Sequence, residues 1–200
     1  MAYPYLELLT TDDVIRAQEE NGTREQWEDF QGDREFTAFD ENAEAFLAAR
    51  DSLYMASQSA NGWPYIQHRG GPIGFLKVLS PTAFGFADYS GNKQYITVGN
   101  ARSDERVSLF LMDYARRKRL KILARLTVMS AQDNPELARK LVDTDYRANV
   151  ERLMLFDLVA YDWNCPQHIT PRYSKMAVQE ALAELKAENE ALKRQLEHAR

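Results

Sequence analysis

The sequence predicts a mainly β protein with flanking helices, in which short strands close a small barrel. Between Gly62 and Met129, short apolar runs alternate with tight-turn residues, a pattern typical of a small barrel. The first 52 residues carry fourteen acidic and four basic side chains in segments with helical spacing. The end of the chain repeats apolar residues at the spacing of a heptad. We therefore expect a helical wrap over residues 1–45, a barrel domain over 46–173 and a coiled-coil-like helix over 174–200.

Composition narrows the class of protein. The chain has 200 residues, of which 44% are apolar, enough for one domain with a sizeable core and an appendage. The first seven residues lack the basic and apolar stretches of a signal peptide, and no apolar run approaches the roughly 20 residues that span a bilayer. The single cysteine, Cys165, excludes an internal disulfide. We expect a cytoplasmic protein that does not bind membranes.

Charge is distributed unevenly along the chain. From Gly62 to Met129 there are eleven Lys or Arg and four Asp or Glu, a local charge of +7, whereas the whole chain has a net charge of −5 and the remainder therefore −12. A local positive field in an acidic protein indicates a bound anion. The overall acidity argues against nucleic-acid binding, which favours a basic domain.

Helices are predicted before, between and after the strands of the barrel in the sequence. In the acidic region we expect helices near Thr11–Glu20 and Asn42–Arg50, the first with Thr11 as its N-cap and Asn21-Gly22 at its end. Further helices are predicted at Lys93–Gly99, Pro135–Val142 and Lys175–Ala199.

Strand predictions follow from alternation and turn chemistry. Asn61-Gly62 is a strong hairpin signal, and the glycines of Gly70–Gly74 exclude a regular ladder there. In one late strand, Leu120 and Ile122 face inward in alternation with Arg119, Lys121 and Arg125. The predicted strands are Ser52–Ser59, Trp63–Arg69, Phe75–Leu79, Ala83–Ala87, Val107–Asp113, Leu120–Met129 and Arg152–Tyr161.

Two stretches carry the residue types of an anion site. Arg69 and Lys77 flank the glycine loop, and Ser90-Gly91-Asn92-Lys93 supplies a hydroxyl, an amide and an ammonium at a predicted strand-to-helix junction. Ordinary surface lysines and turn glycines would give the same pattern, so both interpretations remain open. Neither the nucleotide P-loop nor the Rossmann glycine pattern is present.

The sequence predicts no metal site. Its only histidines are His68, His168 and His198, and the last falls in the terminal helix. With Cys165 they leave too few ligands for zinc. A nucleophilic role for Cys165 beside His168 and a structural role remain alternatives.

The terminal helix has heptad character. Apolar residues recur at steps of three and four, and Asn189 falls at an a position between them. The helix either pairs with a second copy or packs its stripe on its own barrel. The stripe consists of Val178, Leu182, Leu185, Leu192 and Leu196.

Several of these stretches, in this order, resemble the pyridoxamine 5′-phosphate oxidase-like family of flavin-binding split barrels. The resemblance covers residues 46–129 and, more loosely, 150–173. It rests on Arg50–Ala56, Asn61–Tyr65, Gln67–Pro72, Leu76-Lys77, Ser90–Lys93, Arg106–Phe110 and Arg119–Lys121. It implies a six-stranded split barrel that forms a homodimer with FMN at the interface, so that 46–173 would be an FMN-binding domain.

The resemblance also implies site residues. Arg69 and Lys77 match basic residues on the family's phosphate-side strands, and Lys93 matches its clearest phosphate ligand, whereas Asn92 stands where an Arg is usual. The implied cofactor-binding set is His68, Arg69, Lys77, Ser90, Asn92, Lys93, Gln94, Arg119, Lys121 and Trp163. Trp163, His168 and Arg172 would close the site from the partner chain, the last two on the substrate side. No residue is assigned as a catalytic acid or base.

The function expected is that of an FMN-dependent oxidoreductase acting on a small-molecule substrate. True pyridoxamine-phosphate oxidases hold the substrate phosphate with Tyr-x-x-x-Arg-x-x-x-Ser and Arg-x-His patterns, and neither occurs here. Vitamer oxidation is therefore not expected. The alternative is a non-catalytic module that binds flavin, haem or a related cofactor for storage or sensing. A deazaflavin in place of FMN also remains open.

Overall fold

The computed structural model describes residues 3–28, 30, 32 and 34–198. The chain divides into two units, 1–112 with 119–165, and 113–118 with 166–200. The elements in chain order are α1 (Pro4–Glu7), α2 (Asp12–Glu20), α3 (Arg24–Glu28), α4 (Glu41–Ala48), β1 (Ser52–Gln58), β2 (Pro64–Gly70), β3 (Lys77–Ser80), β4 (Ala83–Tyr89), α5 (Ile96–Ser103), β5 (Arg106–Asp113), β6 (Lys118–Met129), α6 (Pro135–Leu141), β7 (Val150–Trp163) and α7 (Lys175–His198).

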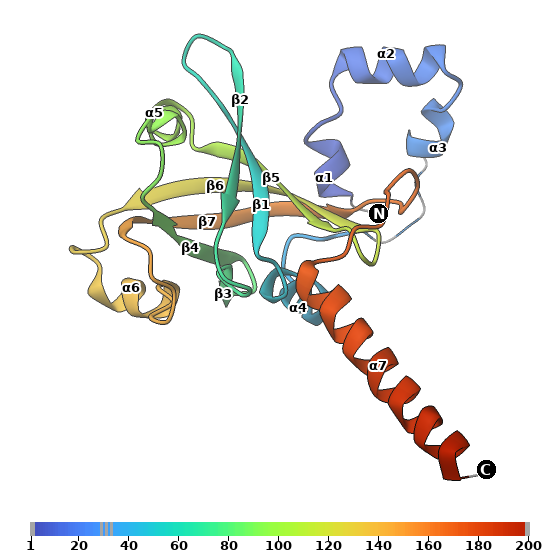
Figure 1. Ribbon diagram of the computed structural model, residues 1–200. Coiled ribbons are helices and arrows are strands. Elements are labelled where there is room, and N and C mark those ends of the chain that lie inside the picture. Colours follow the sequence, from blue (N-terminus) through green and yellow to red (C-terminus); the bar gives the residue numbers. More distant parts are fainter. Residues whose placement is uncertain (1–2, 29, 31, 33, 199–200) are drawn as a thin grey trace. The chain divides into compact units, whose positions relative to one another are not determined.

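The first unit is built on one sheet with the strand order β2-β1-β5-β6-β7-β4-β3 (Figure 1). The pairings of β1 with β2 and β5, of β4 with β3 and β7, and of β6 with β7 are all antiparallel. The expectation of a mainly β fold with flanking helices is confirmed. The family resemblance implied six strands, whereas the sheet has seven, because the short β3 pairs with β4 as a separate strand at one edge.

The hairpin predicted at Asn61-Gly62 is confirmed. Strands β1 and β2 pair from Ser52↔Gly70 to Gln58↔Pro64, and the backbone N–H of Ser59 donates to the Trp63 carbonyl at 3.0 Å. Gly62 has φ +89°, a conformation that glycine adopts without the steric cost of a side chain.

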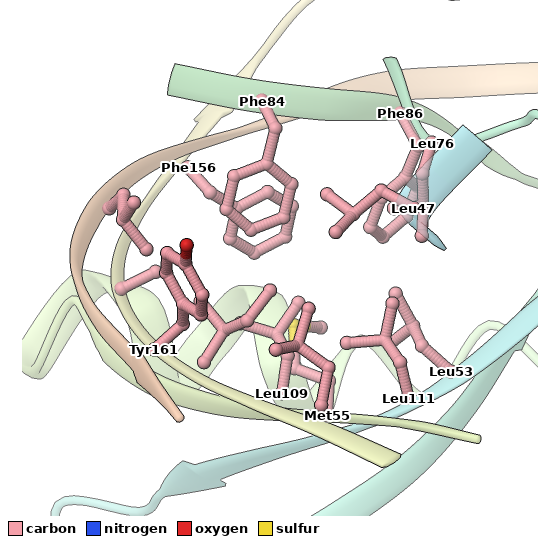
Figure 2. Close-up of a cluster of buried hydrophobic side chains, with 14 of the residues drawn as sticks. Leu47, Leu53, Met55, Leu76, Phe84, Phe86, Leu109, Leu111, Phe156 and Tyr161 are labelled. Atoms are coloured by element: carbon pink, nitrogen blue, oxygen red, sulfur yellow. The ribbon is translucent and has the colours of Figure 1, made fainter. Parts of the chain in front are cut away.

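The core fills the space enclosed by the curled sheet. Figure 2 shows Phe84, Phe86 and Phe156 from β4 and β7 opposite the aliphatic side chains Leu53, Met55, Leu109 and Leu111 from β1 and β5. Phe84 stacks on Phe156 with ring centroids 4.8 Å apart, and both rings are fully buried. Because β6 separates β1 and β5 from β7 and β4 in the order of the sheet, the core that these four strands share requires the sheet to curl onto itself.

Alternation along β6 follows the prediction. Leu120, Ile122, Ala124 and Leu126 are buried, whereas the intervening residues are more exposed. Each inward residue therefore adds to the core, and Arg119, Lys121 and Arg125 lie on the other face of the strand.

The helices before the sheet begin close to their predicted positions. Thr11 caps α2 by accepting a hydrogen bond from the Val14 N–H, and Asn21 is its C-cap, as expected. The second predicted helix begins earlier than Asn42, because the Asp40 side chain accepts from the Ala43 N–H and makes Asp40 the N-cap of α4. Buried Arg50 then holds the end of α4 by donating to the Phe46 and Met112 carbonyls.

Helix α5 begins three residues later than predicted. The expected start was Lys93, but Lys93 and Tyr95 have φ values of +58° and +53°. This left-handed conformation is incompatible with a right-handed helix, so α5 starts at Ile96.

In the second unit, α7 is a helix of 24 residues, and none of them is buried. No helix among the described residues is long and apolar enough to cross a membrane.

Two glycine substitutions should have opposite effects on stability. A Cβ at Gly85 would lie 2.7 Å from the Met154 carbonyl oxygen on the paired strand, whereas a Cβ at Gly99 of α5 meets no described atom within 4 Å. Gly85→Ala should lower the free energy of unfolding by about 1–3 kcal/mol through overpacking. Gly99→Ala should raise it by about 0.5–1 kcal/mol, since alanine favours the helix. Urea denaturation measures both, and equal shifts would contradict the close approach of β4 and β7.

Candidate functional site

A cavity of about 190 Å³ lies in the first unit, between β2, the end of β4, the start of β7 and the segment leading into α5. Its wall is mostly polar or charged. The lining residues are Tyr65, Gln67, Arg69, Asp88, Tyr89, Gly91, Asn92, Lys93, Gln94, Tyr95, Ile96, Thr97, Val98, Glu151 and Arg152.

An ion-pair network spans this cavity. Arg69 Nη1 donates to Asp88 Oδ1 at 2.9 Å, and Arg152 Nη1 lies 3.7 Å from Asp88 Oδ2. Asp88 and Arg152 are directly opposite each other in the pairing of β4 with β7, so the sheet register fixes this second contact. One carboxylate therefore holds two guanidinium groups from two different strands.

Burial sets the electrostatics of Asp88. Its side chain is only 6% exposed. Burial raises the pKa of Asp88, because the ionised form loses hydration, while Arg69 and Arg152 act in the opposite direction. Asp88 and the two guanidinium groups that it contacts are thus held in an environment of low polarity, where a charged ligand interacts strongly.

Arg152 is fixed from two further sides. Its Nη2 lies 2.6 Å from Glu151 Oε2, and its guanidinium carbon lies 4.6 Å from the centre of the Tyr95 ring. The Tyr95 hydroxyl donates to Glu151 Oε1 at 3.3 Å. Arg152 is therefore pre-oriented on the cavity wall, which lowers the entropy lost on binding a ligand.

The segment before α5 brings a polar loop to the cavity. The Asn92 side chain accepts from the Gln94 N–H at 3.1 Å and stabilises a turn around Lys93. Lys93 is exposed, lines the cavity and forms no ion pair with another described residue. A Cβ added at Gly91 would meet no described atom within 4 Å, so the loop leaves open space beside the cavity.

Two buried polar atoms of the cavity wall have no hydrogen-bond partner within the described part of the chain. They are Arg69 Nε and Thr97 Oγ1. Buried polar atoms in proteins are nearly always satisfied, and an exception in a cavity indicates a ligand or water. Both atoms can donate a hydrogen bond, so the wall suits an anion.

The structure thus brings together four of the residues that the resemblance implied, Arg69, Asn92, Lys93 and Gln94. Ser90 adjoins this group in sequence, but it is exposed and is not among the lining residues. Its backbone N–H donates to the Asn149 carbonyl at 2.8 Å.

Two other implied residues lie outside the cavity. His68 is exposed and alternates with Arg69 on β2, so it faces the opposite side of the strand, where it packs edge-on against Tyr54. Lys77 lies on β3, opposite Gly85, and does not line the cavity.

Arg119, Lys121 and Trp163 also lie apart from it. Lys121 Nζ is 2.8 Å from Asp162 Oδ2 and 4.5 Å from the centre of the Tyr5 ring. Trp163 packs edge-on against Phe46 of α4. Arg119 is half-buried, and its Nε has no hydrogen-bond partner in the described part of the chain.

His168 and Arg172 belong to the second unit. His168 is exposed with φ +60°, and the Arg172 guanidinium carbon lies 4.9 Å from the centre of the Tyr114 ring in the same unit. Within the described residues, no group of three or more His, Cys, Asp or Glu side chains is placed to hold a metal ion.

Sequence reasoning missed the acidic part of the site and one of its arginines. Asp88, Glu151 and Arg152 come from strands that are distant in sequence, and only the register of β4 and β7 reveals them. For Tyr65 and Gln67 a signal existed in the sequence. They precede Arg69 by four and two residues, and every second residue of a strand lies on the same face.

A sequence model of the pyridoxamine 5′-phosphate oxidase family matches residues 39–189, which is 151 of the 200 residues (189 − 39 + 1). The chain belongs to this family. Membership and the antiparallel sheet with its flanking helices confirm the predicted fold class of a split barrel. The matched range is longer than the resemblance seen in the sequence, since it includes α4 and the first part of α7.

Solved structures similar to this member of the pyridoxamine 5′-phosphate oxidase family have low sequence identity to it. HupZ of Group A Streptococcus is 11% identical, covers 68% of this chain and 100% of its own, and has a TM-score of 0.48. An FMN-binding protein of Syntrophomonas wolfei is 12% identical, with coverage of 74% and 97% and a TM-score of 0.45. An F420 reductase is 10% identical, with coverage of 62% and 98% and a TM-score of 0.44. No curated protein matches the sequence.

The raised pKa of Asp88 predicts a pH dependence of stability. Its ordinary value is near 3.8, and the folded value is higher because of burial. The folded chain therefore binds this proton more tightly than the unfolded chain, and that contribution to stability is lost as the pH rises from the ordinary pKa through the folded one. As the pH rises above about 4, the free energy of unfolding should fall relative to that of Asp88→Asn, which does not titrate. A relative rise with pH would mean that the two arginines outweigh burial. Chemical denaturation at a series of pH values measures the difference.

Proposed function

We propose that this protein binds FMN, with the phosphate group in the cavity lined by Arg69, Lys93 and Arg152, and that it is a flavin-dependent oxidoreductase acting on a small molecule. The proposal rests on one observation above the others. A single cavity combines these three cationic side chains with two unpartnered hydrogen-bond donors, Arg69 Nε and Thr97 Oγ1. Family membership supports a flavin as the ligand.

The charge balance of the cavity suits a phosphate group. Arg69, Lys93 and Arg152 contribute +3, and ionised Asp88 and Glu151 contribute −2, which leaves +1 before a ligand enters. The two carboxylates engage the arginines, so Lys93 supplies the excess positive charge. Charge-assisted bonds from guanidinium and ammonium groups are the usual means of holding phosphate in proteins.

The size of the cavity supports a site completed by a second copy of the chain. Pockets for complete small molecules are typically about 300–1,000 Å³, whereas this cavity measures about 190 Å³. One chain therefore surrounds the phosphate end of a flavin nucleotide. We propose that a homodimer encloses the ring, with residues of the partner copy covering it.

When bound, the flavin supplies the redox chemistry, and the residues of the cavity wall bind and orient it. Asp88 keeps Arg69 and Arg152 in place, Tyr95 covers Arg152, and Thr97 presents a hydroxyl to the cavity. None of these residues needs to exchange a proton with the substrate, and we assign no catalytic acid or base among them.

The first test compares two lysines. Lys93→Ala should weaken FMN binding by about ten- to hundredfold, because a hydrogen bond to a charged group contributes about 1.5–3 kcal/mol. The matched control is Lys77→Ala, which removes the same side chain from β3, outside the cavity. It should leave FMN affinity unchanged. Titration of flavin fluorescence with the purified dimer measures both affinities, and thermal melting without FMN checks that both variants fold.

Three results would overturn parts of this proposal. If the wild-type protein shows no FMN-induced change in melting temperature, the cofactor assignment is wrong. If Lys77→Ala weakens binding as much as Lys93→Ala, the phosphate lies elsewhere. Tighter binding of a deazaflavin than of FMN would change the cofactor while keeping the site.

The second test concerns the reaction. Because both sequence patterns for the substrate phosphate are missing, the FMN-loaded protein should turn over pyridoxamine 5′-phosphate negligibly compared with a true oxidase. If the protein is an oxidoreductase, NADH or NADPH should nevertheless reduce the bound flavin, and the reduced flavin should then be reoxidised. Stopped-flow absorbance measures both steps. Saturable formation of pyridoxal phosphate at ordinary enzyme rates would contradict the first expectation. Flavin that resists reduction by either donor would favour the non-catalytic storage or sensing module.

A further inference from the structure

The apolar stripe of α7 is exposed along its whole length. Leu182, Leu185, Leu192 and Leu196 are between 50% and 67% exposed, and no residue of the helix is buried. Burial of such side chains away from water is favourable, so a repeated exposed stripe indicates a missing partner. Its regular spacing restricts that partner to a straight surface of helical periodicity.

The heptad register is unambiguous. Val178, Leu185 and Leu192 occupy d positions, and Leu182, Asn189 and Leu196 occupy a positions. In a parallel pair of identical helices, each a residue meets its own counterpart. In an antiparallel pair, an a residue faces a d residue of the other helix.

Asn189 separates these two arrangements. In the parallel pair, the two Asn189 side chains face each other and satisfy each other by hydrogen bonding, which fixes register and favours two strands. In the antiparallel pair, each Asn189 amide faces an apolar d residue and is buried without a hydrogen-bond partner, which destabilises that arrangement.

The flanking charges favour the same arrangement. Lys186 and Lys193 occupy e positions, and Glu188 occupies a g position. Parallel pairing places Glu188 of each chain next to Lys193 of the second copy, since a g residue meets the e residue five positions later. Antiparallel pairing brings e positions together and would place lysines against lysines, which is repulsive.

We propose that α7 pairs with α7 of a second copy as a parallel, in-register, two-stranded coiled coil. The helix spans about 36 Å at 1.5 Å per residue, and its 24 residues hold just over three heptads. This pairing of α7 does not involve the cavity in the first unit and needs no flavin.

Disulfide cross-linking of the full-length protein tests the proposal. The exposed native Cys165 is first replaced by Ser, and single cysteines are then placed in α7. Leu185→Cys and Leu196→Cys report on d and a positions, and the control Ala187→Cys lies at an f position on the outer face. All three sites are on a helix without buried residues, so folding of the rest of the chain should not change. We expect both core cysteines to cross-link rapidly under mild oxidation, and the control to cross-link far more slowly.

The pattern of cross-links decides whether the two helices are parallel and in register. If Leu185→Cys cross-links but Leu196→Cys does not, the pairing is antiparallel or out of register, and the proposal is wrong. Equal cross-linking of all three shows proximity without a defined face, and no cross-linking shows that the stripe is covered by something other than a second copy. Both results also overturn the proposal.

A charge swap provides an independent check. Lys193→Glu places like charges at positions 188 and 193 of neighbouring chains, so the melting temperature of the helix should fall. The double variant Glu188→Lys with Lys193→Glu restores opposite charges and should recover it. In an antiparallel pair, Lys193→Glu would instead relieve repulsion and raise the melting temperature.

Discussion

The ion pair between Arg69 and Asp88 joins strands that stand first and sixth in the order of the sheet. Such a contact is possible only when the sheet curls until its two ends meet. The aromatic and aliphatic side chains inside the curl drive closure, since burying two charges contributes little net stability. What the pair adds is position: a guanidinium of β2 is held at a defined place beside Arg152 of β7. Closure of the barrel and assembly of the cavity are therefore one event.

Much of the fold could be predicted because it is encoded locally. Asn61-Gly62 specifies a tight hairpin, Thr11 supplies a capping oxygen, and the alternation from Leu120 onward needs only a strand with one buried face. The start of α5 could not be predicted in the same way. Lys93 and Tyr95 have left-handed backbone conformations that neither residue type favours, and only the surrounding structure imposes them.

The candidate site was predictable only where its residues are near one another in sequence. The loop from Asn92 to Gln94 and the basic residue Arg69 stand out as residue types suited to an anion. Asp88 and Arg152 do not, because an acidic residue at the end of an apolar strand is ordinary, and their contact depends on the register of strands about sixty residues apart (152 − 88 = 64). Lys121 is a different case, since its residue type suits an anionic ligand and its Nζ lies 2.8 Å from Asp162 Oδ2.

The strand order also determines when the chain can fold. Strand β4 ends at Tyr89, but its partner β7 is complete only at Trp163, 74 residues later (163 − 89). At about 5–20 residues per second, a ribosome needs about 4–15 s to make that stretch. During this time Phe84 and Phe86 lack the Phe156 ring on which both later stack, and such pairings between distant segments are slow to form. The barrel therefore closes only late in synthesis, and the nascent chain is exposed to aggregation until β7 emerges.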